Sequence, residues 1–190
     1  MIEIEVYARS SVAIIPTIII WVLFTVLIVG SCSLIWLKGR QKGKYYVARL
    51  MLAEWIVLVF CSAVIFREAM AASLINLIPL WSYFQYPDDS YLKEMVAINI
   101  LNVVLFVPIG FLLKCGFRNM TWKLILLLSF ILSSSVELMQ FLFRKGLCEI
   151  DDIIHNVIGC MIGYGVATMT LTLTLTIKKT ITKKIRNEFI

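Results

Sequence analysis

The chain alternates between long apolar stretches and short polar connections. Five stretches carry at most one charged residue each and are long enough, or almost long enough, to cross a bilayer as helices. They are residues 12–37, 50–66, 95–113, 124–143 and 153–177. A membrane-spanning helix needs roughly 20 apolar residues, with about 17 to 25 tolerated. Residues 50–66 are at the short limit, so we expect that helix to begin earlier, near Tyr45.

A sixth apolar segment, residues 69–85, is interrupted by Asn76, Pro79 and Gln85. If it crossed the membrane fully, each later connection would change sides and the Lys-rich C-terminal tail would face outward. The segment is therefore predicted to be an interfacial or re-entrant helix that ends near Pro79. The aromatic residues after Pro79 are typical of a membrane interface, and residues 86–90 have the composition of a turn.

Composition excludes a soluble domain. Of the 190 residues, 61% are hydrophobic and 16% are charged, and the mean hydropathy is +0.91. A soluble domain of this length could not bury so much apolar surface, so lipid must cover part of it. We therefore predict an all-α fold, namely a polytopic transmembrane helix bundle of about five spans plus the interfacial or re-entrant helix. Residues 1–190 would form a single integral membrane domain.

Basic residues predict the orientation of this domain. The connections after the first, third and fifth stretches hold 13 Lys and Arg residues, and the remaining connections hold 5. The positive-inside rule places the richer side in the cytoplasm. The expected location is the cell membrane, with several passes, an extracytoplasmic N-terminus and a cytoplasmic C-terminus. Because the net charge of +6 comes from residues beside apolar stretches, no nucleic-acid partner is expected.

Polar residues that are costly in a membrane gather near the predicted outer face. Glu137 lies inside residues 124–143, about 9 Å from their outer end at a rise of about 1.5 Å per residue. A buried carboxylate in a span indicates a partner and often a function. Polar residues from several spans reach the same level: Arg67, Asn99, Asn102, Gln140, Arg144, Asp151, Asp152, His155 and Asn156. We predict that they form one extracytoplasmic pocket.

The sequence also predicts a partner for Glu137 in this pocket and a close helix contact deeper in the membrane. Glu137 should be held by a cationic or amide group from another helix, because an unpaired charge at that depth is expensive. The expected partners are Arg67, Asn99, Asn102 and Asn156. Gly159-x-x-x-Gly163 is a small-residue pattern that lets helices approach closely, so residues 153–177 should pack against residues 95–113 or 124–143.

The same residues carry a resemblance to a known family. The motifs are Asn99-x-x-Asn102, Phe106-x-Pro108-x-Gly110, Glu137-x-x-Gln140, Arg144 and Asp151-Asp152-x-x-x-Asn156-x-x-Gly159, preceded by Asn76-Leu77-Ile78-Pro79. In this order and spacing, about residues 65–166 resemble the VanZ-like family of small bacterial membrane proteins. That family usually has an Arg shortly before the Asp, and here Arg144 is the candidate. The resemblance implies low-level resistance to glycopeptides, teicoplanin especially, exerted from the membrane.

Three functions fit these features. The first is a cell-envelope protein whose partners are the bilayer and a lipid-linked cell-wall precursor or glycopeptide-related ligand. The second is a membrane enzyme acting on a lipid, with Glu137 and Asp152 or Asp151 as an acid–base pair and Asp151 orienting His155. Its substrate-binding candidates are Arg67, Asn99, Asn102, Gln140, Arg144 and Asn156. The third is a small lipid transporter with Glu137 as a proton site, against which the lack of an internal repeat weighs.

A structural reading stays open beside these functions. Asn, Gln and Glu side chains also hold membrane helices together, at about 0.6 to 2 kcal/mol per hydrogen bond. No cofactor is expected, because the sequence lacks a phosphate loop, a nucleophile elbow and zinc-ligand spacing. A divalent metal on Glu137, Asp151, Asp152 and His155 would be chemically feasible but has no supporting motif.

Overall fold

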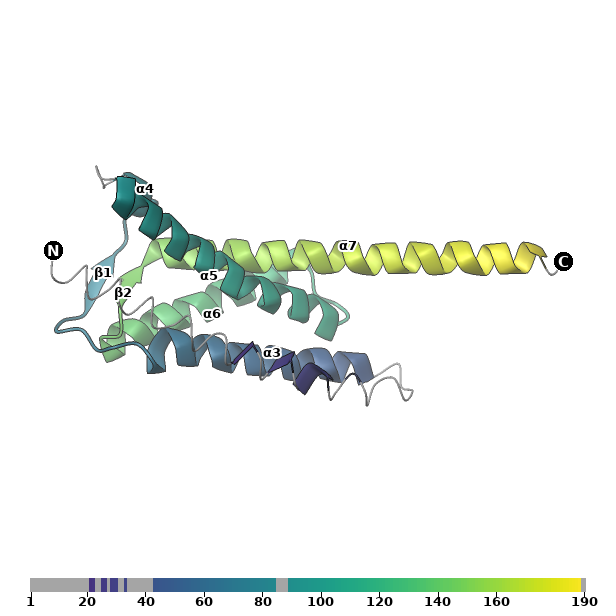
Figure 1. Ribbon diagram of the computed structural model, residues 1–190, viewed down its shortest axis with the longest axis horizontal. Coiled ribbons are helices and arrows are strands. Elements are labelled where there is room, and N and C mark those ends of the chain that lie inside the picture. The colour runs from purple at the N-terminus through teal and green to yellow at the C-terminus, as the bar shows by residue number, and fades with distance from the viewer. Residues whose placement is uncertain are drawn as a thin grey trace.

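The computed structural model is a bundle of long helices with one helix that continues far beyond the others (Figure 1). The structure describes residues 43–84 and 89–188, with short helical pieces at 21–22, 25–26, 28–30 and 33. Its elements are α3 (Gly43–Phe60), η1 (Cys61–Ile65), β1 (Leu74–Asn76), α4 (Trp81–Phe84), α5 (Asp89–Gly116), α6 (Trp122–Phe143), β2 (Leu147–Glu149) and α7 (Ile150–Glu188). Most of the predicted first span, residues 12–37, and part of the predicted turn at 86–90 lie outside the described residues.

The described part of the chain has four helices that are long and apolar enough to cross a membrane. They cover Gly43–Ile65, Met95–Gly116, Trp122–Phe143 and Ile150–Asn187, where the second to fifth apolar stretches predicted spans. The first of them begins at Gly43, close to the expected start near Tyr45. The all-α membrane helix bundle is therefore confirmed.

Helix α7 is longer than the predicted span 153–177, because it continues through the Lys-rich tail to 39 residues. Alternating Thr and Leu residues in this part would suit a strand by their period. The structure instead shows Thr hydroxyls donating to the carbonyl four residues earlier, as Thr170 does to Val166 at 2.8 Å and Thr174 does to Thr170 at 2.8 Å. These bonds satisfy the hydroxyls within the helix itself.

The structure of residues 66–80 contradicts the prediction of an interfacial or re-entrant helix. These residues do not form the expected helix ending near Pro79, because Leu74–Asn76 form β1 and helix α4 begins only after Pro79. Strand β1 pairs in parallel with β2, in the register Leu74↔Leu147, Ile75↔Cys148 and Asn76↔Glu149. The sequence of a short apolar segment does not distinguish a helix from a strand. Here the strand forms because it pairs with β2, which lies far along the chain.

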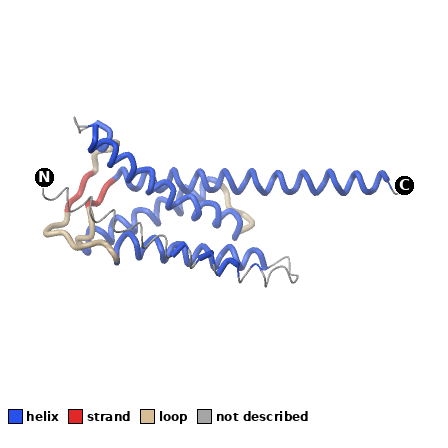
Figure 2. Tube along the Cα trace, in the orientation of Figure 1, coloured by secondary structure: helices blue, strands red, loops and turns tan. Residues whose placement is uncertain are grey.

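The connection from α3 to α5 stays at one end of the bundle. Figure 2 shows both strands at that end, beside the end of α6 and the start of α7. We call it the strand end. The segment that contains β1 therefore does not cross the bundle.

Three glycines let helices α5 and α7 approach each other closely. A Cβ atom added to Gly159 would lie 2.2 Å from the Val103 carbonyl oxygen, and one added to Gly163 would lie 1.9 Å from that of Val107. On the facing helix, a Cβ at Gly110 would lie 1.8 Å from the Cys160 carbonyl oxygen. The predicted close packing at Gly159 and Gly163 is confirmed, with α5 as the partner.

Candidate functional site

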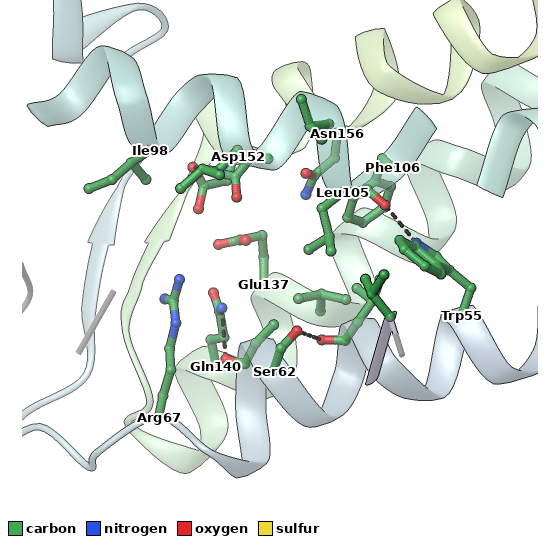
Figure 3. Close-up of a pocket in the computed structure, with 17 residues that line it drawn as sticks. Trp55, Ser62, Arg67, Ile98, Leu105, Phe106, Glu137, Gln140, Asp152 and Asn156 are labelled. Carbon is green, nitrogen blue, oxygen red and sulfur yellow. Dashed lines mark hydrogen bonds between the residues drawn. The ribbon is translucent and has the colours of Figure 1, made fainter. Parts of the chain in front are cut away.

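A cavity of about 210 Å³ lies among α3, α5, α6 and α7 (Figure 3). Its polar walls are six of the ten predicted site residues: Arg67, Asn102, Glu137, Gln140, Asp152 and Asn156. Figure 3 shows Arg67, Glu137, Gln140 and Asp152 pointing toward one another. The remaining wall is mainly apolar, with Trp55, Val59, Ile98, Leu101, Val104, Leu105, Phe106, Val136 and Val22.

Glu137 projects into this cavity from α6 and is only 2% exposed. Its Oε2 accepts a hydrogen bond of 3.0 Å from the backbone N–H of Glu149. This partner comes from strand β2, a source that the sequence prediction of a side chain from another helix did not include. Arg67, one of the predicted partners, lines the same cavity. The return of the chain after α6 thus places a backbone donor against a carboxylate buried in the bundle.

Two further hydrogen bonds hold α7 to its neighbours at the cavity. Asn102 Nδ2 on α5 donates to Asp152 Oδ1 at 2.7 Å. Asn156 Nδ2, one turn below Asp152, donates to Ser133 Oγ on α6 at 2.9 Å. Asp152 and Asn156 are both nearly fully buried. Hydrogen bonds from side-chain amides therefore hold these buried polar side chains in place.

Gln140 and Arg67 connect the cavity to the end of α3. Gln140 Nε2 donates to the carbonyl oxygen of Ala63 at 3.0 Å. Ala63 belongs to η1, a π-helical turn that ends two residues later, which leaves this carbonyl available for a side chain. The Arg67 guanidinium packs against Gly146, where an added Cβ would lie 2.7 Å from its Nη1. Only a glycine at position 146 leaves the guanidinium in this place.

Four predicted site residues do not line the cavity. The Asp151 carboxylate accepts a hydrogen bond from the backbone N–H of Leu80, and His155 Nδ1 donates to the Asp151 carbonyl oxygen at 2.6 Å. His155 Nε2 then accepts from the hydroxyl of Tyr83 at 2.9 Å. Asp151 and His155 therefore hold the segment before α5. The carbonyl oxygen of Asp151 thus orients the His155 ring.

Asn99 and Arg144 are the other two. Asn99 is 4% exposed and lies on α5 outside the cavity wall. Arg144 ends α6 in a left-handed conformation with φ of 54°, its side chain is exposed, and its carbonyl accepts from the Met70 N–H at 2.6 Å. Arg144 therefore lies outside the cavity, because α6 has already ended at Phe143.

Glu149 is a buried residue at the site that the sequence did not predict. It is 5% exposed in β2, and burial raises its pKa to about 9, with the nearby Asp152, Glu137 and Asp151 carboxylates adding to the rise and Arg67 opposing it. The folded structure therefore favours the protonated, neutral form of Glu149. A single Glu in a short segment after a helix gave no signal, because its burial depends on the pairing of β2 with β1.

The structure does not gather the four residues considered for a divalent metal. The Asp151 carboxylate bonds the Leu80 N–H and His155 bonds the Tyr83 hydroxyl, and neither residue lines the cavity that Glu137 and Asp152 share. Within the described ranges, no three His, Cys, Asp or Glu side chains are arranged to hold a metal ion.

Comparison with known proteins decides the family. The family model named VanZ/LLP1 matches residues 17–173, which include the site and all four described spans up to the last turns of α7. The chain belongs to the VanZ/LLP1 family. Protein VanZ of Enterococcus faecium is 33% identical over 102 residues, covering 48% of this chain and 61% of VanZ. The chain therefore spans about three fifths of the length of this curated relative. No solved structure matches the chain.

Proposed function

We propose that this VanZ/LLP1 protein reduces the action of teicoplanin-type glycopeptides by acting, through its polar cavity, on a lipid-linked or other cell-envelope target. The drug class follows from the association of VanZ-like proteins with low-level glycopeptide resistance. The cavity is proposed as the site because buried polar side chains line it. Membership of the family and the placement of six motif residues around one space together support this assignment.

The observation that carries the proposal is the convergence of three ionisable side chains inside an apolar bundle. Arg67, Glu137 and Asp152 come from three parts of the chain, are each at most 8% exposed and line one cavity. Burying such groups costs several kcal/mol per ion before pairing, so helix packing would be served as well by apolar residues. A ligand site gives a reason for these residues that packing does not.

The orientation that we propose places this cavity at the outer leaflet. The connection between α5 and α6, which holds Arg118 and adjoins Lys114 and Lys123, lies at the other end of the bundle, away from the strands, as does the Lys-rich extension of α7 (Figure 1). Arg49 donates to the Gly116 carbonyl at that end. With that end in the cytoplasm by the positive-inside rule, the strand end and the polar part of the cavity face outward. Lipid-linked cell-wall precursors are used at that face of the membrane.

The size of the cavity favours an envelope component over the whole drug. Sites for drug-sized ligands measure about 300–1,000 Å³. A cavity of about 210 Å³ admits a lipid head group or one segment of a larger molecule. We therefore assign the protective effect to a changed or sequestered envelope target rather than to capture of a complete glycopeptide.

Glu137→Gln is the test. Gln keeps the shape of the side chain and an oxygen that accepts from the Glu149 N–H, but it can neither ionise nor exchange a proton. We expect this variant to reach the membrane at the wild-type level and to lose protection against teicoplanin. Glu54→Gln, on α3 and outside the cavity wall, is the control and should keep protection. Wild-type protection by Glu137→Gln at equal membrane level would remove the carboxylate from the mechanism and favour helix packing as its role.

A membrane enzyme is the second candidate, because two carboxyl groups, on Glu137 and Asp152, line one cavity. Such a pair can place one proton donor and one proton acceptor within reach of the same substrate. Lipid and muropeptide profiles of cells with wild-type protein and with Glu137→Gln separate the two candidates. A modified lipid or muropeptide that disappears in the variant supports the enzyme, and unchanged profiles support a binding protein.

A further inference from the structure

The buried walls of the cavity leave hydrogen-bond acceptors unused. Gln140 is 2% exposed, and its Nε2 is committed to the Ala63 carbonyl, which can only accept. Its Oε1 has no donor within the described part of the chain, and the same holds for Oδ1 of Asn156, a residue 4% exposed. Buried polar atoms in native proteins have partners almost without exception. Two buried acceptor oxygens beside one cavity therefore indicate a ligand that donates hydrogen bonds.

The ionisable side chains that line the cavity indicate whether that ligand is an anion or a cation. Two carboxyl side chains, those of Glu137 and Asp152, line the cavity with a single guanidinium from Arg67. An anionic ligand would meet two carboxyl groups and two amide oxygens. A group with several N–H donors and a positive charge satisfies both, since hydrogen bonds between charged partners are about twice as strong as neutral ones.

The apolar wall indicates that this group is attached to a lipid. Leu101 and Val104 on α5 line the cavity and yet are 48% and 57% exposed, so the cavity reaches the surface of the bundle that faces the membrane. Trp55 and Leu105 continue the apolar wall inward and are joined by a hydrogen bond of 2.8 Å from Trp55 Nε1 to the Leu105 carbonyl. A polar end next to an apolar side opening fits an amphiphile.

We propose that the cavity binds the primary-ammonium head group of a membrane phospholipid that enters from the side, past Leu101 and Val104. The ammonium group lies beside Glu137 and donates to the amide oxygens of Gln140 and Asn156, and Arg67 faces the phosphate. This ligand assignment rests on the proposed site at the cavity but not on the resistance phenotype.

Phospholipids that differ in one group test the assignment. The full-length protein is purified in detergent and mixed with equal amounts of phosphatidylethanolamine, phosphatidylcholine and phosphatidylglycerol that carry the same acyl chains. Retained lipid is measured by native mass spectrometry. All three have the phosphate, but only phosphatidylethanolamine has N–H donors on a cation. We expect it to be retained at least about tenfold over the other two. Equal retention of the three lipids overturns the proposal.

Variants and a soluble competitor locate the binding. Glu137→Gln should bring phosphatidylethanolamine down to the level of phosphatidylcholine, and Gln140→Met should reduce its retention in the same direction. Glu54→Gln should retain it as the wild type does. Undiminished selectivity in Glu137→Gln places the lipid elsewhere and overturns the site. Glycerophosphoethanolamine, which lacks acyl chains, should compete only weakly, and competition equal to that of the lipid overturns the lipid assignment.

Failure of this proposal and failure of the proposed function give different results. If Glu137→Gln loses teicoplanin protection but the wild type shows no preference for phosphatidylethanolamine, the function stands and the ligand class is wrong. If the preference is present and depends on Glu137 while protection is unchanged, the ligand class stands and the resistance function is wrong.

Discussion

The backbone N–H of Glu149 donates a 3.0 Å hydrogen bond to the Glu137 carboxylate. This bond joins the strand pair to the cavity, because Glu149 is the last residue of β2 and is opposite Asn76 in β1. The segment between α3 and α5 is thereby attached, through two strands, to the carboxylate that the proposed function requires. Changes in the strand pair should therefore alter the cavity as well as the surface of the strand end.

The glycine contacts between α5 and α7 give a prediction with a control on the same helix. Gly163→Ala places a Cβ 1.9 Å from the Val107 carbonyl oxygen, so the helices must separate. We expect a loss of about 1–3 kcal/mol of stability, as for overpacked cores. Gly165→Ala meets no atom within 4 Å and should be neutral or slightly stabilising. Thermal unfolding in detergent measures both, and equal stabilities of the two variants would contradict the packing.

Glu149 predicts how stability depends on pH. Its pKa is raised from the model-compound value of 4.5 to about 9, chiefly by burial, so the folded protein keeps a proton that the unfolded chain releases. Stability should therefore fall as pH rises from about 5 to about 9, by up to about 1.4 kcal/mol per pH unit. Glu149→Gln should flatten this dependence in detergent-solubilised protein.

The exposed Glu68, at the same end of the bundle, supplies the control for this pH series. Glu68→Gln should keep the wild-type slope of stability against pH. The interpretation fails if the wild type becomes more stable toward pH 9, or if Glu149→Gln keeps the full slope.

The strand pair predicts a disulfide. Ile75 and Cys148 are Cα partners in the parallel register, and Cys148 is a free thiol. Neighbouring strands lie about 4.8 Å apart, within the Cα separation of about 4.4–6.8 Å that disulfides allow. Ile75→Cys should therefore cross-link to Cys148 under mild oxidation, detected as the loss of two thiols to maleimide labelling. Ile78→Cys, beyond β1, should cross-link far less, and Cys148→Ser should abolish the product.

Labelling of single cysteines tests the orientation. In a chain whose native cysteines are replaced by Ala, Glu68→Cys should react with a membrane-impermeant maleimide in intact cells, because the strand end is predicted to face outward. Lys183→Cys, on the extension of α7, should react only after permeabilisation. The reverse pattern would place the cavity at the cytoplasmic leaflet.

Local properties of the sequence predicted the spans and the level of the polar residues. Hydropathy is summed over neighbouring positions, so Gly43–Ile65 and Trp122–Phe143 are readable without knowing what they pack against. Each crossing reverses direction, so the positions of Asn102, Glu137 and Asp152 along their spans fixed that they meet at one end. Gly159 and Gly163 likewise indicated a helix contact, although not which helix.

Tertiary structure decided the direction in which each side chain points and what it bonds. Asp151 and Asp152 are adjacent in the sequence, yet one bonds Leu80 outside the cavity and the other bonds Asn102 at its wall. The pairing of β1 with β2 buries Glu149 and brings its amide to Glu137. These outcomes depend on helix rotation and on contacts between segments up to 73 residues apart in the strand register. A local pattern carries neither, because it records which residues need a partner but not where the folded chain supplies one.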